Sequence, residues 1–175
     1  ISELEKIGVC VVNSRTTIST AADKYRTYIR LKDYGLTQPK TELIPNAESL
    51  EFSVKNLDTK FPIILKTLRG SKGVGVLFIE SEKALDSIVQ LIHKQDEDTD
   101  LLLQEYIPTD YDVRVLVLGG KVLATMKRPV IEGDFRSNVS QGSKPEKIKL
   151  TEIEIEASLL AAKAVDGSWS AVDFI

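Results

Sequence analysis

Residues 61–80 read FPIILKTLRGSKGVGVLFIE, and the fold that we predict is built outward from this stretch. Two apolar runs, 61–66 and 74–80, flank a polar segment rich in glycine, which is typical of two strands joined by a flexible tip. Backbone N–H groups in such a tip can approach a phosphate. The alternative is a plain hairpin turn, because the segment is neither a Walker loop nor a dinucleotide-binding fingerprint.

Two lysines strengthen the phosphate interpretation. Lys66 ends the first apolar run, where its ammonium group can lie beside phosphates that the glycine-rich segment covers. The alternative is an edge lysine that reaches solvent. Lys24 lies in the first turn of a predicted helix, where the helix dipole disfavours a cation, so it is either simply exposed or faces an anion.

The composition describes a folded protein with no general affinity for nucleic acid. The chain has 175 residues, of which 42% are hydrophobic, enough for one domain or two small lobes. No apolar run approaches the ~20 residues of a membrane span, so we expect no membrane association. The net charge of −3 argues against general nucleic-acid binding. Cys10 is the one cysteine, which we expect in the core, and its lack of a disulfide partner favours a cytoplasmic location.

The first predicted helix is capped by Thr20, with Asp23 at its third position, and runs to about Tyr34, before Gly35. A later helix ends near His93, which we expect to be exposed beside the negative end of the helix dipole.

The second half of the chain predicts strands. Gly119-Gly120 joins the alternating runs 113–118 and 121–126, a strong hairpin signal. The chain ends in WSAVDFI, a further strand pattern in which Asp173 shares a face with apolar residues. A carboxylate in that position must be paired or must bind a metal. Asp112-Val113-Arg114 places an acid and a base at a strand start, where a structural salt bridge is one interpretation.

These elements predict an α+β fold with two lobes and a cleft between them as the binding site. Residues 1–36 form a linker and first helix, 37–98 the smaller lobe with the glycine-rich loop, and 99–175 the larger lobe. We expect the chain to be a piece of a longer protein that lacks residues at both ends, because it does not begin with Met and stops inside a strand.

Together the motifs resemble the ATP-grasp superfamily, and within it the RimK-like carboxylate–amine ligases. The matching segments, in order, are Asp23-Lys24, ILK at 64–66, GSKGVGV at 70–76, LLLQEYI at 101–107, DVR at 112–114, EGDFRSN at 132–138 and AVDFI at 171–175. The ordered set is specific, EGDFRSN above all, and it covers the chain from about Ile7 onward.

The resemblance implies the ATP-grasp fold, with two α+β lobes that grip ATP. It implies nucleotide contacts from Lys24, Lys66, Gly70, Ser71, Lys72, Gly73, Gly75, Glu105, Tyr106, Asp112, Arg136, Ser137 and Asn138. It implies catalytic roles for Arg128, Arg136 and Asn138, the two arginines being candidates for the substrate carboxylate. It places Mg²⁺ or Mn²⁺ at Asp173, with the remaining metal ligands beyond Ile175.

The implied reaction is amide formation through an acyl phosphate. A small-molecule or peptide carboxylate attacks the ATP γ-phosphate, and an amino-acid amine then displaces phosphate from the carbonyl. Addition of glutamate to a protein or peptide is one candidate. Relatives in the family are often dimers or tetramers, so a homo-oligomer is one option for the intact protein. The alternatives are a nucleotide-binding module without ligase activity, since 139–143 departs from the family pattern, and a purely structural domain.

Overall fold

The computed structural model describes residues 1–69, 75–130 and 144–175. The chain forms two compact units, one of Ile1–Gln38 with Thr109–Ile175 and the other of Pro39–Pro108. The predicted glycine-rich residues Gly70, Ser71, Lys72 and Gly73, and the predicted site residues Arg136, Ser137 and Asn138, lie outside the described residues.

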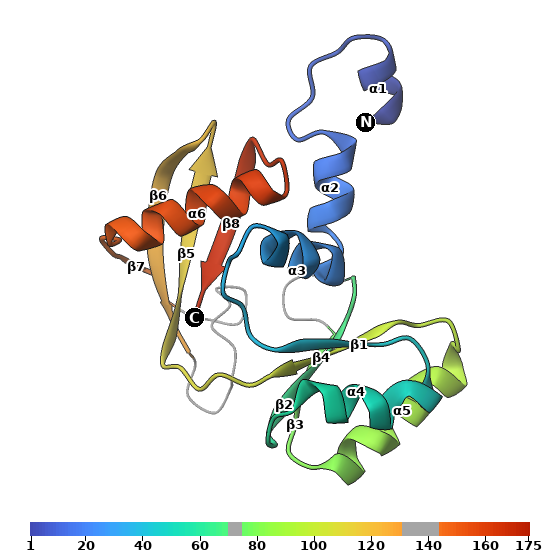
Figure 1. Cartoon of the computed structure of the whole chain (residues 1–175). Helices are drawn as coiled ribbons and strands as arrows, with labels where there is room; N and C mark the ends of the chain where they lie inside the picture. Colours follow the sequence, from blue (N-terminus) through green and yellow to red (C-terminus); the bar gives the residue numbers. More distant parts are fainter. Residues whose placement is uncertain (70–74, 131–143) are drawn as a thin grey trace. The chain divides into compact units, whose positions relative to one another are not determined.

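The unit of Pro39–Pro108 is an antiparallel sheet covered on one face by two helices (Figure 1). Its strands follow the order β1-β4-β2-β3. Its elements are β1 (Thr41–Ile44), η1 (Ala47–Ser49), α4 (Leu50–Leu57), β2 (Ile63–Thr67), β3 (Val76–Ile79), α5 (Glu82–Gln95) and β4 (Leu101–Glu105). Strands β2 and β3 confirm the two strands predicted on either side of the glycine-rich segment.

The core of this unit gathers apolar residues from every strand and from both helices. The fully or almost fully buried members are Ile44, Leu57, Ile63, Leu65, Ile79, Leu85, Val89, Leu101 and Leu103. Strand β4 lies between β1 and β2 in this sheet, so the boundary that we predicted at residue 99 is wrong and lies after Pro108. Leu101, Leu102 and Leu103 are all buried, so side chains on both faces of β4 are shielded from water.

The other unit carries a second antiparallel sheet with the order β7-β6-β5-β8, on which α6 packs (Figure 1). Its elements are α1 (Ser2–Lys6), α2 (Arg15–Ala21), α3 (Lys24–Asp33), β5 (Tyr111–Leu118), β6 (Lys121–Pro129), β7 (Glu146–Lys147), α6 (Glu152–Ala164) and β8 (Trp169–Phe174). The predicted hairpin is confirmed: Gly119 and Gly120 adopt φ of 55° and 73°, the left-handed region that its turn requires.

Three local predictions are wrong. The helix predicted from Thr20 is two helices, because Asp23 is the N-cap of α3 and accepts hydrogen bonds from the amides of Tyr25 and Arg26. Cys10 is exposed, since its apolar run forms no strand and packs in no core. His93 is buried, because the turn after α5 brings the Thr99 carbonyl within 2.9 Å of its Nε2.

Helix α5 offers a matched test of the core. Leu85 is fully buried in the cluster, whereas Leu91 on the same helix is 58% exposed. Leu85→Ala should lower the free energy of unfolding by about 2–5 kcal/mol, because it removes buried apolar surface and leaves a cavity. Leu91→Ala, which has the same effect on helix propensity, should change it by less than about 0.5 kcal/mol. Urea titration followed by circular dichroism measures both, and equal losses would contradict the packing described.

Candidate functional site

Four charged residues form a ladder across the β7-β6-β5-β8 sheet. Asp112 and Arg114 lie on β5, Arg128 on β6 and Asp173 on β8. Since successive residues of a strand face opposite sides, Asp112 and Arg114 share one face, and the intervening Val113 packs in the core beneath α6. The charged ladder therefore occupies the face of the sheet that the core does not use.

The strand register brings the ladder together in two cross-strand pairs. Asp112 lies opposite Arg128, and Arg114 lies opposite Asp173. An unbroken register from the hairpin turn would place Asp112 opposite Lys127, but a β-bulge between Leu116 and Val117 shifts the pairing by one residue. Because a shift of one residue reverses the face of every later side chain, the bulge puts Arg128 on the charged face.

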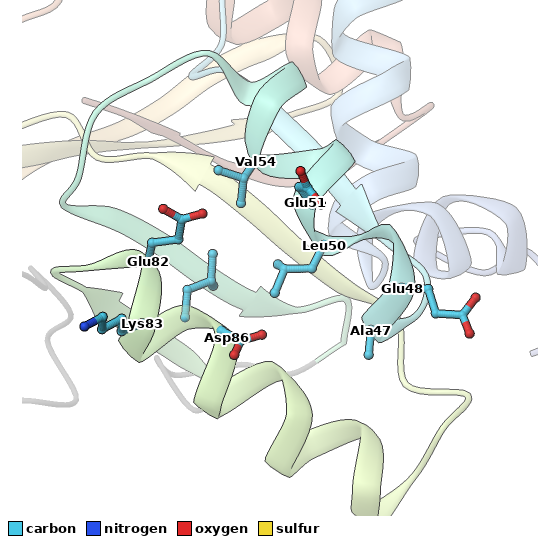
Figure 2. A pocket seen from close by; sticks show the side chains of 9 residues that line it. Ala47, Glu48, Leu50, Glu51, Val54, Glu82, Lys83 and Asp86 are labelled. Atoms are coloured by element: carbon cyan, nitrogen blue, oxygen red, sulfur yellow. The ribbon is translucent and has the colours of Figure 1, made fainter.

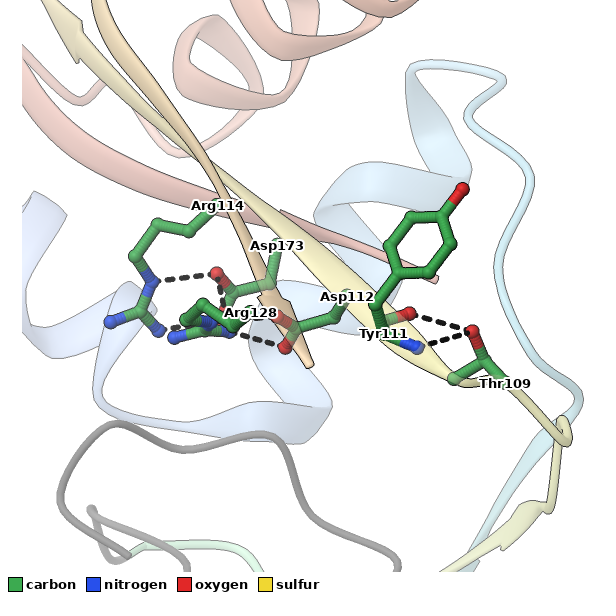
Figure 3. A network of polar contacts seen from close by, with 6 residues as sticks. All are labelled: Thr109, Tyr111, Asp112, Arg114, Arg128 and Asp173. Atoms are coloured by element: carbon green, nitrogen blue, oxygen red, sulfur yellow. Dashed lines mark hydrogen bonds and ion pairs between the residues drawn. The ribbon is translucent and has the colours of Figure 1, made fainter. Parts of the chain in front are cut away.

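Both pairs are bidentate, and a third contact joins them (Figure 3). Arg128 donates from Nε to Asp112 Oδ1 at 2.6 Å and from Nη2 to Asp112 Oδ2. Arg114 donates from Nε to Asp173 Oδ1 at 2.7 Å and from Nη2 to Asp173 Oδ2 at 2.6 Å. Arg128 Nη2 also lies 3.2 Å from Asp173 Oδ1, so Asp173 is held by two guanidinium groups.

The two pairs differ in their access to water. The Arg128 side chain is 3% exposed, whereas the side chains of Arg114 and Asp173 are 35% and 43% exposed. The hydrogen bond to Asp173 raises the pKa of Arg114 above its usual value, against the opposing effect of burial, with help from the charges of Asp173 and Asp112. Arg114 therefore remains a cation that can exchange its carboxylate partner for water.

These contacts answer part of what the sequence suggested about Asp173 and Arg128. The prediction that Asp173 is paired or binds a metal is met by its pairing with two arginines. Arg128, a candidate for the substrate carboxylate, contacts two carboxylates of the chain itself. Sequence reasoning missed Arg114 as the main partner of Asp173, because only the β5–β8 register places these residues side by side.

Lys66 is the predicted phosphate contact on β2 of the Pro39–Pro108 unit. It lies near the end of β2, opposite Val76 of β3 and Leu102 of β4. Its Nζ donates to Gln104 Oε1 at 2.5 Å, and Gln104 Nε2 donates to Thr41 Oγ1 at 2.8 Å. Gln104 is the diagonal neighbour of Lys66 across the strand pair, within the reach of long side chains. The hydrogen bond to Gln104 thus helps to hold the ammonium group over the sheet.

Gly75 shows why the segment after β2 requires glycine at its base. Its φ is 77°, and a Cβ atom there would fall on the side chain of Thr67. Thr67 in turn donates its backbone N–H to the Gly75 carbonyl at 3.0 Å. Two independent constraints, the left-handed backbone and the close Thr67 contact, therefore exclude a larger residue at position 75.

Glu105 is the last residue of β4, and Tyr106 follows it. The Glu105 amide donates to the Lys40 carbonyl at 3.0 Å, and the Lys40 amide donates to Glu105 Oε1 at 2.7 Å. The Tyr106 ring packs edge-on against Phe78, with 5.0 Å between ring centroids. These contacts fix the direction in which the chain leaves the sheet.

Lys24 is the first residue of α3, directly after the capping carboxylate of Asp23. Burial lowers the pKa of Lys24 from its usual value, while the charge of Asp23 acts in the opposite direction. The positive end of the helix dipole favours anions near this position, which keeps Lys24 among the candidates for contact with phosphate.

A separate hollow in the Pro39–Pro108 unit is unsuited to phosphate. It has a volume of about 460 Å³ and lies between α4 and α5 (Figure 2). Of the described residues that line it, four are acidic and one is basic: Glu48, Glu51, Glu82, Asp86 and Lys83. The acidic side chains repel the negative phosphates of a nucleoside triphosphate, so the hollow does not favour its binding.

Asp173 is the predicted metal ligand among the residues that the structure describes. Among the residues that the structure describes, no cluster of three or more His, Cys, Asp or Glu side chains could hold a metal ion. A metal site formed entirely by side chains of the described residues is therefore excluded. Mg²⁺ commonly uses one or two carboxylates and completes its shell with water and substrate phosphates, and a partly exposed Asp173 fits that role.

A family model for the RimK-like ATP-grasp domain matches residues 21–175. The chain belongs to the RimK-like ATP-grasp family. A protein of Psychromonas ingrahamii named probable alpha-L-glutamate ligase is 34% identical to it over 175 residues, 99% of this chain and 57% of that protein. One from Coxiella burnetii with the same name is 33% identical and is matched over 58% of its length. The chain thus spans a little over half of the curated relatives that it matches.

Solved structures show the same fold. The D-alanine–D-alanine ligase of Bacillus anthracis complexed with ATP aligns with a TM-score of 0.78 at 22% identity, over 98% of this chain and 56% of that one. The ATP-grasp ligase PsnB, solved with minimal precursor, Mg and ADP, aligns with a TM-score of 0.70 at 23% identity, over 97% and 50%. The predicted ATP-grasp fold is confirmed. In the described residues, no helix is long and apolar enough to cross a membrane.

The two arginines of the ladder should differ in their contribution to stability. Arg128→Gln should lower the free energy of unfolding by about 3–5 kcal/mol, because it removes the bidentate cationic partner of the largely buried Asp112 carboxylate. Arg114→Gln should cost no more than about 1 kcal/mol, because its pair is part-exposed and water can replace the lost contacts. Urea denaturation of both variants measures the difference, and a larger loss for Arg114→Gln would contradict the burial described.

Proposed function

We propose that the protein containing this chain is an ATP-dependent ligase that joins a carboxylate to an amine through an acyl phosphate. The observation that carries the proposal is the match of the RimK-like ATP-grasp family over residues 21–175. Curated relatives named probable alpha-L-glutamate ligase support glutamate as the amino acid. The carboxylate acceptor would be the end of a protein or peptide, or a small molecule.

The proposed reaction makes demands that these residues can meet. In the first step a carboxylate oxygen attacks the γ-phosphorus of ATP and ADP leaves. In the second step the amine attacks the acyl carbonyl, phosphate leaves, and the amine loses a proton. Transfer of a phosphoryl group depends mainly on positioning and charge neutralisation, so no nucleophilic side chain is needed.

The cationic side chains would supply most of that neutralisation. Lys66, held over its sheet by Gln104, and Lys24, at the start of α3, would face phosphate oxygens. The glycine-rich residues 70–75 would supply backbone N–H donors, and Glu105 and Tyr106 would flank the adenine. Asp112 would lie near the nucleoside, and Arg128, Arg136, Ser137 and Asn138 would line the acyl-phosphate region.

Asp173 is the proposed ligand of Mg²⁺ or Mn²⁺. The divalent cation supplies further charge neutralisation at the phosphates when it is bound. Asp173 is suited to this part because β8 fixes its backbone and its carboxylate keeps solvent access.

Turnover assays test the proposed function directly. The full-length protein, given Mg²⁺, ATP and a panel of amino acids and short peptides, should release ADP and phosphate and form an amide product visible by mass spectrometry. Glutamate should give the highest rate among the amino acids. Binding of ATP without turnover, on any member of the panel, would instead favour a nucleotide-binding module without ligase activity.

Lys66 can be tested with a matched lysine in the same unit. Lys66→Met should lower kcat/KM for ATP by about 10²-fold or more, because it removes a positive charge that faces developing negative charge on the phosphates. Lys55→Met, on the exposed side of α4, should leave turnover unchanged. Melting temperatures of both variants control for folding. Normal turnover by Lys66→Met would remove Lys66 from the site.

A further inference from the structure

The two arginines that hold Asp173 are not equivalent, and the difference suggests how a cation reaches that carboxylate. We propose that Arg114 is a displaceable positioning residue, which occupies Asp173 until a divalent cation takes its place, whereas Arg128 stays and fixes the carboxylate. This inference rests on the proposed function, in which Asp173 binds the metal.

The first support is the difference in partners. Arg128 contacts two carboxylates, Asp112 and Asp173, and its side chain is 3% exposed. If Arg128 moved away, it would leave the largely buried Asp112 without its bidentate partner and would itself lose two anions, which is a large cost. Arg114 donates two hydrogen bonds to Asp173 alone, and its side chain is 35% exposed. Water can replace those bonds when Arg114 turns away.

The second support is the remaining capacity of the Asp173 carboxylate. A carboxylate offers about four lone-pair positions. Three contacts use them here: Arg114 Nε and Arg128 Nη2 on Oδ1, and Arg114 Nη2 on Oδ2. A cation that binds Oδ2 therefore shares that oxygen with Arg114 and leaves the Arg128 contact on Oδ1 in place. The geometry makes Arg114 the direct competitor.

Charge repulsion decides which group leaves. A guanidinium and a divalent cation on one carboxylate oxygen repel each other, even in bulk water. The part-exposed Arg114 can relieve this repulsion by swinging into solvent, whereas Arg128 is enclosed. A released Arg114 guanidinium then faces the same surface as the bound cation, where it can meet an anion such as the triphosphate.

Metal affinity tests the competition. Mn²⁺ is titrated into the full-length protein saturated with ADP, and free Mn²⁺ is followed by electron paramagnetic resonance. Arg114→Gln should bind Mn²⁺ at least about fivefold more tightly than the unaltered protein, because the competitor is gone. Arg114→Lys, which keeps the charge but loses the bidentate contact, should fall between the two. Arg15→Gln, which removes an exposed arginine from the same unit, should bind as the unaltered protein does.

A second readout follows the arginines themselves. In protein labelled with ¹⁵N-arginine, the Nε–H signal of Arg114 should lose its carboxylate-bound shift when Mg²⁺ and ADP are added, and that of Arg128 should remain. The Arg114→Gln and Arg128→Gln variants assign the two signals. Circular dichroism of the Arg114 variants controls for folding.

The outcomes separate this inference from the proposed function. If Asp173→Asn weakens Mn²⁺ binding but Arg114→Gln leaves it unchanged or weakens it too, Arg114 is not a competitor, and only the present inference is overturned. If Asp173→Asn has no effect on Mn²⁺ binding, Asp173 is not the metal ligand, and the displacement is overturned together with that assignment. If ADP does not bind, the proposed function is overturned as well. An Arg114 signal that is unmoved by Mg²⁺ and ADP likewise overturns the displacement.

Discussion

The bidentate contact between Arg128 and Asp112 is the interaction on which the charged face of the β7-β6-β5-β8 sheet depends. It exists because a β-bulge between Leu116 and Val117 shifts β5 against β6 by one residue. Without that shift Arg128 would point to the opposite face, where the valines of β5 pack against α6. The bulge thus converts a hairpin of ordinary sequence into a scaffold that can hold Asp173.

The same reasoning explains how far the sequence could predict the structure. Local chemistry was sufficient for the hairpin at Gly119-Gly120, since its turn depends on neighbouring residues. The order of strands in the sheets was harder to predict than this local feature. The inner place of β4 depends on which strands it pairs with, and 101–105 carries that information only as an unusually continuous apolar run.

The errors at single residues share one physical cause. His93 was expected at the surface because its own helix end favours a cation, yet the turn that follows α5 covers it and supplies the Thr99 carbonyl. Cys10 was expected in a core because its neighbours are apolar, yet an apolar run is buried only where a partner surface exists. Arg114 was grouped with Asp112 by sequence distance, although the β5–β8 register gives it to Asp173. In each case the deciding contact, or its absence, lay beyond the residue's immediate neighbours in sequence.

The charge balance of the ladder connects its stability to its proposed use. Two aspartates and two arginines leave the ladder itself without net charge, so these paired groups neither attract nor repel a nucleotide strongly at a distance. A divalent cation on Asp173 would make the same face positive, and a displaced Arg114 would present a guanidinium no longer neutralised by its partner. Metal and triphosphate would then each favour the binding of the other, because affinities that are coupled through one set of charges are reciprocal. A buried Arg128 is what makes this possible, since it keeps Asp173 in position while the exposed arginine changes partner.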